Sequence, residues 1–278
     1  MKLKKKLPEN RNLEQVRKHF EIEKSIAEKI KRASREERKK IFPVMYRELF
    51  TKVPDHPRLS KTKMTDTNSQ TLQFLKEYLD ESTVYVEFGP GDCQFASTVC
   101  KYTKKVIAVD IYDQRKDRSS LPSNFELIIY DGYDLNMERN SADVVFSDQF
   151  IEHLHPEDVE YHFQLVNRIL RDNGLYIFRT PHAYFGPHDI SKFFSDEPEG
   201  FHLKEWTHSE IEEILKKVNF TSWDGFWRIN NKLNNEYLKI PFSYFKIAEA
   251  MLKGLPKKPQ RKVSRLFLPL KVFMIAVK

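Results

Sequence analysis

The sequence predicts a doubly wound α/β fold, with a mostly parallel sheet of seven strands, helices on both faces and a helical N-terminal extension. From residue 84 onward, short apolar stretches alternate with amphipathic segments. Such alternation indicates a parallel sheet that is covered on both faces. Residues 1–60 are instead densely charged, with apolar side chains at helical spacing. We therefore expect a basic helical extension over 1–60 and an α/β domain over 61–278.

The extension is predicted to contain two helices. Residues 13–33 have the periodicity of an amphipathic helix. Ser34 and Glu37 have the spacing of a capping box, so a second helix should begin there. Pro43 should break or kink this second helix, because proline lacks the amide hydrogen that an inner turn needs. The polar, proline-containing residues 54–69 then indicate a linker.

Seven short apolar stretches are the candidate strands. They lie at residues 84–88, 106–110, 125–129, 143–147, 174–178, 220–229 and 272–277. Helices are expected at about 70–80, 93–102, 156–170 and 206–218. A basic, helix-prone insertion at about 239–265 separates the last two strands, and its length indicates a functional role.

Charge is distributed unevenly along the chain. Residues 1–60 hold 18 Lys and Arg against 9 Asp and Glu, and residues 239–278 hold 10 against 1, so each flank has a net charge of +9. The whole chain has +7, so residues 61–238 carry −11. Basic flanks can attract nucleic acid, an anionic membrane surface or a phosphorylated substrate, although solvated helical faces have the same composition.

Composition excludes several classes of protein. Two cysteines, Cys93 and Cys100, are too few for a disulfide scaffold or a cysteine-rich zinc module. The basic N-terminus lacks the apolar stretch of a signal peptide. The most apolar run, residues 266–277, is too short to span a bilayer as a transmembrane segment. We therefore expect a cytoplasmic protein.

A glycine-containing loop follows the first predicted strand. Gly89 and Gly91 stand between this strand and the next helix. Glycines there permit a sharp turn and a close approach of helix amide groups to a ligand. A dinucleotide fingerprint would have a third glycine at position 94, where the chain has Gln94. This difference argues against a nicotinamide-dependent oxidoreductase, which stays an alternative.

Acidic residues end the next two predicted strands. Asp110 closes the second strand, and Asp131 with Gly132 closes the third. A carboxylate at such a position can accept ribose hydroxyls, or the amino group of adenine. Each aspartate could equally cap a helix. Their common placement at the carboxyl ends of successive strands favours a binding role.

Six motifs follow one another in a characteristic order. They are Val86-Glu-Phe-Gly-Pro-Gly91, Ala108-Val-Asp110, Asp131-Gly132, Ala142-Asp-Val-Val-Phe-Ser147, Ile151-Glu-His-Leu154 and Leu170-Arg-Asp-Asn-Gly-Leu-Tyr-Ile-Phe178. Over roughly residues 70–230, this order resembles that of the class I S-adenosylmethionine-dependent methyltransferases. The resemblance implies a Rossmann-like methyltransferase domain, an antiparallel last strand and S-adenosylmethionine as the cofactor.

The resemblance also implies roles for individual residues. Glu87, Gly89 and Gly91 would flank the methionine moiety, Asp110 would bind the ribose hydroxyls, Ile111 would pack on the adenine, Asp131 beside Gly132 would take the adenine amino group, and Asp148 and Gln149 would lie near the methionine end. The acidic middle of the chain suits a cationic sulfonium donor, although salt screens this attraction.

The acceptor side calls for a proton-accepting group. Methyl transfer is an in-line displacement, so the enzyme mainly positions two reactants. A hydroxyl or amine acceptor also loses a proton, which histidine accepts well near neutral pH. His153 and His182, which follow the fourth and fifth strands, are the catalytic candidates, and His155 and His188 are further ones. His153 could equally serve only to order its loop.

Several functions stay open at this stage. The leading one is methyl transfer to an oxygen or nitrogen of a small molecule, sugar or lipid precursor. Gln149, Glu152 and His153, followed by a later histidine, are similar to the Glu-x-x-Glu-His metal site of small-RNA 3′-terminal 2′-O-methyltransferases. Gln149 removes one negative charge from such a site, so we predict no metal and keep the metal-assisted RNA enzyme as an alternative. A non-catalytic Rossmann-like binding module is another alternative.

The basic insertion suggests one more expectation. Residues 239–265, together with the N-terminal helices, should cover the acceptor side of the cleft or form a docking surface beside it. Composition alone is equally compatible with a solvated helical insertion.

Overall fold

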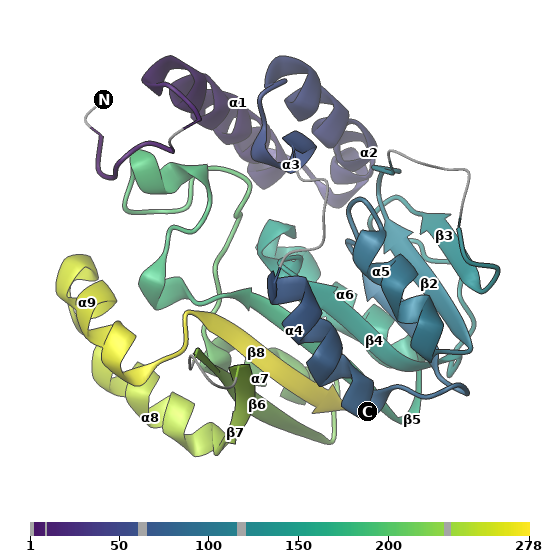
Figure 1. Cartoon of the computed structure of the whole chain (residues 1–278). Coiled ribbons are helices and arrows are strands. Elements are labelled where there is room, and N and C mark those ends of the chain that lie inside the picture. Colours follow the sequence, from purple (N-terminus) through teal and green to yellow (C-terminus); the bar gives the residue numbers. More distant parts are fainter. Residues whose placement is uncertain (1–2, 9, 61–65, 116–120, 231–234) are drawn as a thin grey trace.

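An eight-stranded sheet forms the centre of the molecule in the computed structural model, which describes residues 3–8, 10–60, 66–115, 121–230 and 235–278 (Figure 1). The strand order is β3-β2-β1-β4-β5-β8-β6-β7. The strands are β1 (Val84–Phe88), β2 (Lys105–Asp110), β3 (Phe125–Ile129), β4 (Ala142–Asp148), β5 (Leu170–Pro181), β6 (Ser222–Asn230), β7 (Asn235–Ile240) and β8 (Lys271–Val277). Strands β1 to β5 are parallel, and β8 is antiparallel to both β5 and β6.

The predicted doubly wound fold is confirmed, but the sheet has eight strands and not seven. The additional strand, β7, pairs antiparallel with β6 at the edge of the sheet. An edge strand has a neighbour on one side only and needs no continuous apolar run. The polar sequence of Asn235–Ile240 therefore gave no strand signal, and the expected helical insertion begins with this strand.

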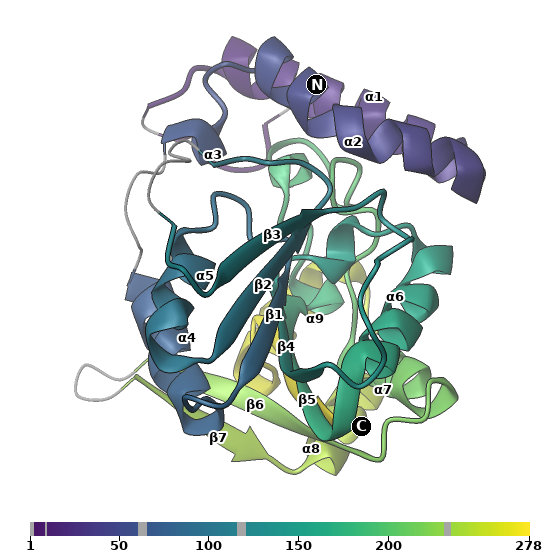
Figure 2. The same ribbon diagram turned by 90° about the vertical axis from the view of Figure 1, so that its right-hand side faces the viewer.

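Helices cover both faces of the sheet. They are α1 (Leu13–Arg32), α2 (Arg35–Lys52), α3 (Pro57–Ser60), α4 (Asp66–Leu75), α5 (Gln94–Val99), α6 (Pro156–Ile169), α7 (His208–Lys217), α8 (Phe242–Leu252) and α9 (Lys257–Phe267). Figure 2 shows α4 and α5 on one face and α6 and α7 on the other. Successive residues of a strand point to opposite faces. Accordingly, Tyr85 packs in the core beneath α4 and α5, and Val86 in the core beneath α6 and α7.

The N-terminal helices α1 and α2 lie across one end of the parallel strands (Figure 2). Ser34 caps α2 in a capping box with Glu37, as predicted. The apolar side of the two helices packs against Tyr133 and Phe201 of the α/β domain. The Arg38 Nε atom lies 2.8 Å from Asp158 Oδ2, so a buried ion pair joins α2 to α6.

Pro43 lies inside α2, and the helix runs without interruption from Arg35 to Lys52. The expected break is therefore absent from this helix. A proline in a helix interior costs about 3 kcal/mol. Four buried side chains on the same helix (Phe42, Met45, Tyr46 and Leu49) offset this cost, because burying each large side chain contributes about 1.5–3 kcal/mol.

In the described part of the chain, every helix is either too short or too polar to cross a lipid bilayer.

Candidate active site

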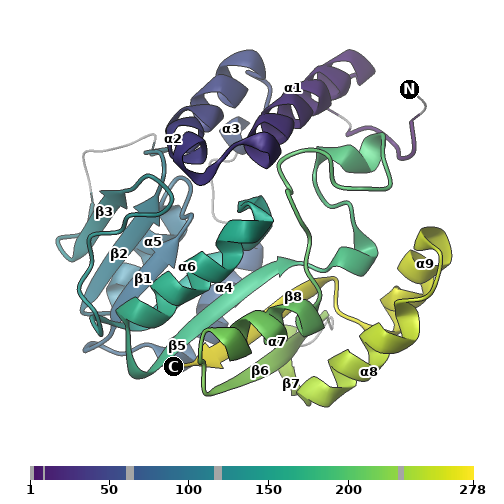
Figure 3. The same ribbon diagram turned by 180° about the vertical axis from the view of Figure 1, so that it is seen from behind.

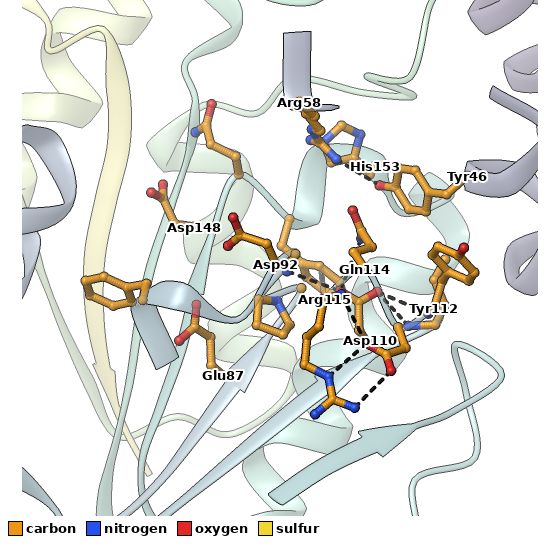
Figure 4. Close-up of a pocket in the computed structure, with 18 of the residues that line it drawn as sticks. Tyr46, Arg58, Glu87, Asp92, Asp110, Tyr112, Gln114, Arg115, Asp148 and His153 are labelled. Carbon is orange, nitrogen blue, oxygen red and sulfur yellow. Dashed lines mark hydrogen bonds and ion pairs between the residues drawn. The ribbon is translucent and has the colours of Figure 1, made fainter. Parts of the chain in front are cut away.

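A cavity of about 610 Å³ opens where the parallel strands end beneath the N-terminal helices (Figure 4). Its floor is formed by three chain segments that leave β1, β2 and β4, at Gly89–Asp92, Ile111–Arg115 and Gln149–Leu154. Residues of α2, α3 and α4 form the opposite wall. The N-terminal helices thus supply part of the expected cover, whereas none of the residues 239–265 lines this cavity.

Backbone geometry explains the glycine in the first loop. Gly89 has a φ of +67°, a conformation that side chains rarely adopt. A Cβ atom at Gly89 would lie 2.6 Å from the Cδ2 atom of Phe150. Gly91 also has a positive φ, of +60°, but the space around a Cβ atom there is open. The loop can therefore turn sharply over Phe150 only because residue 89 has no side chain.

Carboxyl groups give this cavity an acidic lining. Glu87, Asp92, Asp110 and Asp148 all line it. Burial raises the pKa of Glu87 to about 8, and the neighbouring carboxylates act in the same direction. The hydroxyl of Tyr85 donates to Glu87 Oε2 at 3.1 Å and partly opposes this rise. A positively charged group in the cavity would favour the ionised form of Glu87.

Asp110 lies at the tip of β2, as predicted, and its carboxylate organises the floor. The Oδ1 atom accepts the backbone N–H of Ile111 at 2.7 Å, and Oδ2 accepts that of Gly91 at 3.3 Å. Burial raises the pKa of Asp110 to about 6, although these backbone hydrogen bonds favour the carboxylate. Ile111 lines the cavity beside it. Asp110 therefore ties the first loop to the second at the position expected for a ribose.

Asp131 is absent from the cavity lining, whereas Gly132 belongs to it. The Asp131 Oδ1 atom accepts the N–H groups of Tyr133 and Asp134 at 2.9 and 2.7 Å. Asp131 is absent from the cavity lining, so the structure does not bring it to an adenine site. Gly132 does line the cavity; its φ of +95° favours glycine, and a Cβ atom there would lie 2.7 Å from the Cδ2 atom of Phe42 of α2.

His153 is the predicted catalytic residue that the structure brings to the cavity. It follows β4 in a short 3₁₀ helix, Ile151–His153. The Nδ1 atom lies 2.9 Å from the carbonyl oxygen of Phe201, which can only accept, so Nδ1 carries a proton. Burial lowers the pKa of His153 well below its usual value, so the ring is neutral. Its Nε2 atom is buried and has no hydrogen-bond partner among the described residues.

His182 lies elsewhere, which corrects its assignment as a catalytic candidate of the cavity. Its ring is fully buried, and its Nε2 atom lies 2.9 Å from Glu249 Oε1 of α8. Glu249 also accepts the backbone N–H groups of His208 and Ser209, at 2.7 and 2.9 Å. His182 therefore belongs to a buried group that attaches α8 to the start of α7, and it does not line the cavity.

Asp148 and Gln149 reach the cavity at the end of β4. Asp148 is paired with Arg179 of β5, whose Nε atom lies 3.1 Å from Asp148 Oδ1. Gln149 has a φ of +56°, and its buried Nε2 atom has no partner among the described residues. Both residues line the cavity, as Glu87 does, and Figure 4 shows Asp148 and Glu87 on the same side of it.

Two polar residues of the extension, among several that line the cavity, were not predicted from the sequence. Tyr46 of α2 and Arg58 of α3 stand near His153 in Figure 4, and the Arg58 guanidinium donates to the Tyr46 hydroxyl at 3.5 Å. Neither belongs to a motif, because α2 and α3 reach the cavity only through tertiary packing. The basic charge of residues 1–60 was the one signal that pointed to a contact of this kind.

Comparison with known proteins identifies the fold family. A family model described as a methyltransferase domain matches residues 86–178, which contain the first loop, Asp110 and His153. Over these residues, about a third of the chain, the protein has a methyltransferase domain of the S-adenosylmethionine-dependent type. This domain makes it an enzyme of the methyltransferase class. No curated protein sequence gives a significant match.

Solved structures, among them S-adenosylmethionine-dependent methyltransferases, share this fold. YcgJ from Bacillus subtilis is 14% identical with a TM-score of 0.51, and the match covers 76% of this chain and 98% of that one. An S-adenosylmethionine-dependent methyltransferase from Archaeoglobus fulgidus is 16% identical with a TM-score of 0.52, covering 76% and 94%. Phosphoethanolamine N-methyltransferase 2 from Haemonchus contortus is 19% identical with a TM-score of 0.51, covering 76% and 52%. At these identities, the likeness establishes the fold of the methyltransferase domain.

Replacing Asp110 should weaken cofactor binding by this methyltransferase. The Asp110→Ala variant loses a charged acceptor for ribose hydroxyls, which typically costs about 1.5–3 kcal/mol. The Asp110→Asn variant keeps an acceptor for the Ile111 amide and should lose less affinity. Titration calorimetry with S-adenosylhomocysteine measures both affinities. Wild-type affinity in Asp110→Ala would contradict the ribose assignment.

Proposed function

We propose that this methyltransferase transfers a methyl group from S-adenosylmethionine to an oxygen or nitrogen of a small polar acceptor, such as a small molecule, sugar or lipid precursor. The observation that carries the proposal is the state of His153, a residue of the cavity lining: its Nδ1–H is fixed by Phe201, and its buried Nε2 has no hydrogen-bond partner among the described residues. Such a ring can accept a proton at Nε2 without changing its orientation.

The transfer step involves three partners: the cofactor, the acceptor and His153. A lone pair of the acceptor atom forms the bond to the methyl carbon while the bond from methyl to sulfur breaks. The electron pair stays on sulfur, and the cationic sulfonium becomes the neutral thioether of S-adenosylhomocysteine. The proton of the acceptor hydroxyl or amine moves to His153 Nε2. The chain contributes mainly by holding the reactants in line.

The shape of the cavity supports an acceptor of limited size. A volume of about 610 Å³ lies within the range of pockets that enclose one drug-sized ligand. Little space is therefore left for the acceptor once the cofactor is bound. Arg58 and Tyr46 supply a guanidinium and a hydroxyl near His153, so we expect the acceptor to carry a polar or anionic group there.

Binding of the cofactor should release a proton from Glu87. Its pKa of about 8 keeps Glu87 protonated in the free protein at neutral pH, and the cationic cofactor should lower that pKa. Affinity should therefore rise as the pH increases from about 6 to about 8. The folded-state pKa of Glu87 exceeds its usual value in an unfolded chain, so the folded protein binds more protons than the unfolded chain over that range. The stability of the free protein should therefore fall as the pH rises.

Calorimetric titration in two buffers of different ionisation enthalpy measures this proton release. The apparent binding enthalpy of S-adenosylmethionine should differ between the buffers for the wild-type chain and agree between them for Glu87→Gln. Equal enthalpies for the wild-type chain would place the cofactor's charge away from Glu87.

A specific arrangement favours one second candidate, metal-assisted methyl transfer. Ligand atoms of Glu152, His153 and His202 lie within 4.8 Å of one another. Glu152 Oε2 accepts the Thr180 hydroxyl at 2.9 Å, while its Oε1 is buried and has no partner in the described part of the chain. His202 Nδ1 is held by Glu205 at 2.8 Å. Outer partners of this kind commonly orient metal ligands.

Two imidazoles and one carboxylate fit a divalent transition metal. Glu152, His153 and His202 would hold the cation, and a cation there would polarise the acceptor oxygen as a Lewis acid. In this arrangement, His153 Nε2 would bind the metal and could not accept the proton. The two candidates therefore exclude each other at this atom.

An assay with methyl-labelled S-adenosylmethionine distinguishes the two candidates. The enzyme is treated with a chelator and offered a panel of small alcohols, sugars and amines, and separately an RNA oligonucleotide with a free 2′-hydroxyl end. Label transfer to a small acceptor that survives chelation supports proton acceptance by His153. Transfer that is lost on chelation and restored by Mn²⁺ overturns it in favour of the metal. Label found in RNA alone would overturn the small-acceptor proposal.

A further inference from the structure

The α8–α9 hairpin presents an unusual apolar surface to solvent. Among the described residues, most of the large apolar side chains that are exposed lie between residues 238 and 270. Met251, Leu266 and Ile247 have exposed fractions of 77%, 73% and 62%. Figure 3 shows the two helices at the margin of the molecule, beyond β6 and β7. These side chains are therefore exposed on the outer surface of the molecule.

These side chains form one continuous feature, which we call the apolar strip. On α8, Tyr244, Ile247 and Met251 recur at helical spacing on one side. The opposite side of α8 is buried, with Phe245, Ala248 and Leu252 packed against Phe185 and Leu268. The Tyr244 hydroxyl donates to the carbonyl oxygen of Phe267 at 2.9 Å, so the strip continues onto α9. The strip comprises Tyr244, Ile247, Met251, Leu255, Leu266 and Phe267.

Basic residues border this strip. On α9, Lys258, Lys262 and Arg265 lie at helical spacing on the exposed side of the helix, next to Leu266. Their neighbours Lys257 and Arg261 pair with Glu197 and Asp196. No carboxylate of the described residues forms an ion pair with Lys258, Lys262 or Arg265.

The two basic flanks of the sequence meet at this surface. The backbone N–H of Lys4 donates to the carbonyl oxygen of Phe193 at 2.9 Å, which brings the N-terminal segment alongside the loop before α7. Burial and the positive charges of Lys192, Arg261 and Arg265 lower the pKa of Lys5. Segments more than 200 residues apart in sequence therefore bring positive charge together near α9.

We propose that the α8–α9 hairpin docks the enzyme on an anionic membrane surface, with the apolar strip in the interfacial layer and the basic residues at the lipid headgroups. Helices with an apolar side and lysines or arginines beside it bind in the plane of such interfaces. Basic residues near an anionic surface add electrostatic attraction to this apolar contact.

Charge and apolarity together favour this partner over two others. A nucleic acid would use the positive charge but leave Ile247, Met251 and Leu266 in water. A second copy of the chain could cover the apolar strip but would bring like charges together. An anionic bilayer satisfies both halves of the surface.

Sedimentation with vesicles tests the proposal on the full chain. We expect binding to phosphatidylcholine vesicles that contain phosphatidylglycerol, weaker binding to phosphatidylcholine alone, and weaker binding at high salt. The triple variant Ile247→Ser/Met251→Ser/Leu266→Ser should bind at least about tenfold more weakly. The triple variant Lys258→Glu/Lys262→Glu/Arg265→Glu should lose at least as much.

Matched variants at other exposed positions serve as controls. Val44→Ser/Ile129→Ser removes exposed apolar side chains elsewhere, and Lys18→Glu/Lys101→Glu/Lys104→Glu reverses exposed charges elsewhere. Both controls should bind vesicles as the wild type does, and all variants should bind S-adenosylhomocysteine normally. Absence of binding to anionic vesicles at low salt would overturn the proposal. Tight binding of an oligonucleotide that is lost only in Lys258→Glu/Lys262→Glu/Arg265→Glu would also overturn it. Self-association that is lost only in Ile247→Ser/Met251→Ser/Leu266→Ser would do the same.

Discussion

The His153→Gln variant should lower kcat by about 10²- to 10⁴-fold while leaving cofactor affinity unchanged. The glutamine amide can still donate to the carbonyl oxygen of Phe201, but it offers no basic nitrogen in place of Nε2. The loss therefore falls on the transfer step and not on the shape of the cavity. Single-turnover assays with labelled S-adenosylmethionine measure the rate, and calorimetry measures the affinity for S-adenosylhomocysteine.

A second histidine provides the matched control. His155 lies two residues further on and caps α6, where its Nδ1 accepts the backbone N–H of Glu157 at 3.3 Å. Asparagine is also a good N-cap, so His155→Asn should keep both fold and rate. If His153→Gln turned over as fast as His155→Asn, His153 would have no part in proton transfer.

The Gly89→Ala variant should be destabilised by about 2–6 kcal/mol and should bind the cofactor poorly. Alanine is strained at a φ of +67°, and its Cβ would stand 2.6 Å from the Phe150 ring. Backbone strain of this kind costs about 1–3 kcal/mol, and overpacking adds about 1–3 kcal/mol. Relief of the clash would shift the loop or Phe150, and both line the cavity.

Two other glycines separate these contributions. Gly91→Ala keeps the strain of a positive φ, +60°, without a clash, so it should cost less than Gly89→Ala. Gly254→Ala has neither, because nothing lies within 4 Å and its φ lies outside the positive region, so it should be near neutral. Denaturant unfolding ranks the three variants. Equal stability of Gly89→Ala and Gly254→Ala would show that the loop is not constrained as described.

The sequence predicts the parallel part of the fold well because those strands are buried on both faces. Val84–Phe88 and Ala142–Asp148 are buried at most positions, and each contains the short apolar run that such strands require. The edge strand Asn235–Ile240 carries no such signal, since it has one neighbour. The break that was one of the two outcomes expected at Pro43 is absent for a different reason. Local propensity disfavours proline inside a helix, but burial of Phe42 and Leu49 on either side keeps α2 continuous.

The two histidine candidates each follow a parallel strand, but only His153 lines the cavity. His153 follows β4 by five residues, and its short helix folds back to the cavity. β5 pairs with β8 from Leu175 to Pro181. His182 is the next residue, and its ring contacts Glu249 of α8. Similarly, the side chain of Asp131 accepts a backbone hydrogen bond within the turn that follows β3. Placement after a strand was readable from sequence, but strand length and turn geometry depend on tertiary pairing.

Titration calorimetry with S-adenosylhomocysteine and, separately, a nicotinamide dinucleotide tests most directly that the cavity between Glu87, Asp110 and His153 is the cofactor site. We expect S-adenosylhomocysteine to bind the wild-type chain with one site, and its affinity to fall in Asp110→Ala and in Gly89→Ala. We expect the nicotinamide dinucleotide to bind far more weakly. Tighter binding of the nicotinamide dinucleotide, or S-adenosylhomocysteine binding that neither substitution weakens, would contradict this account of the site.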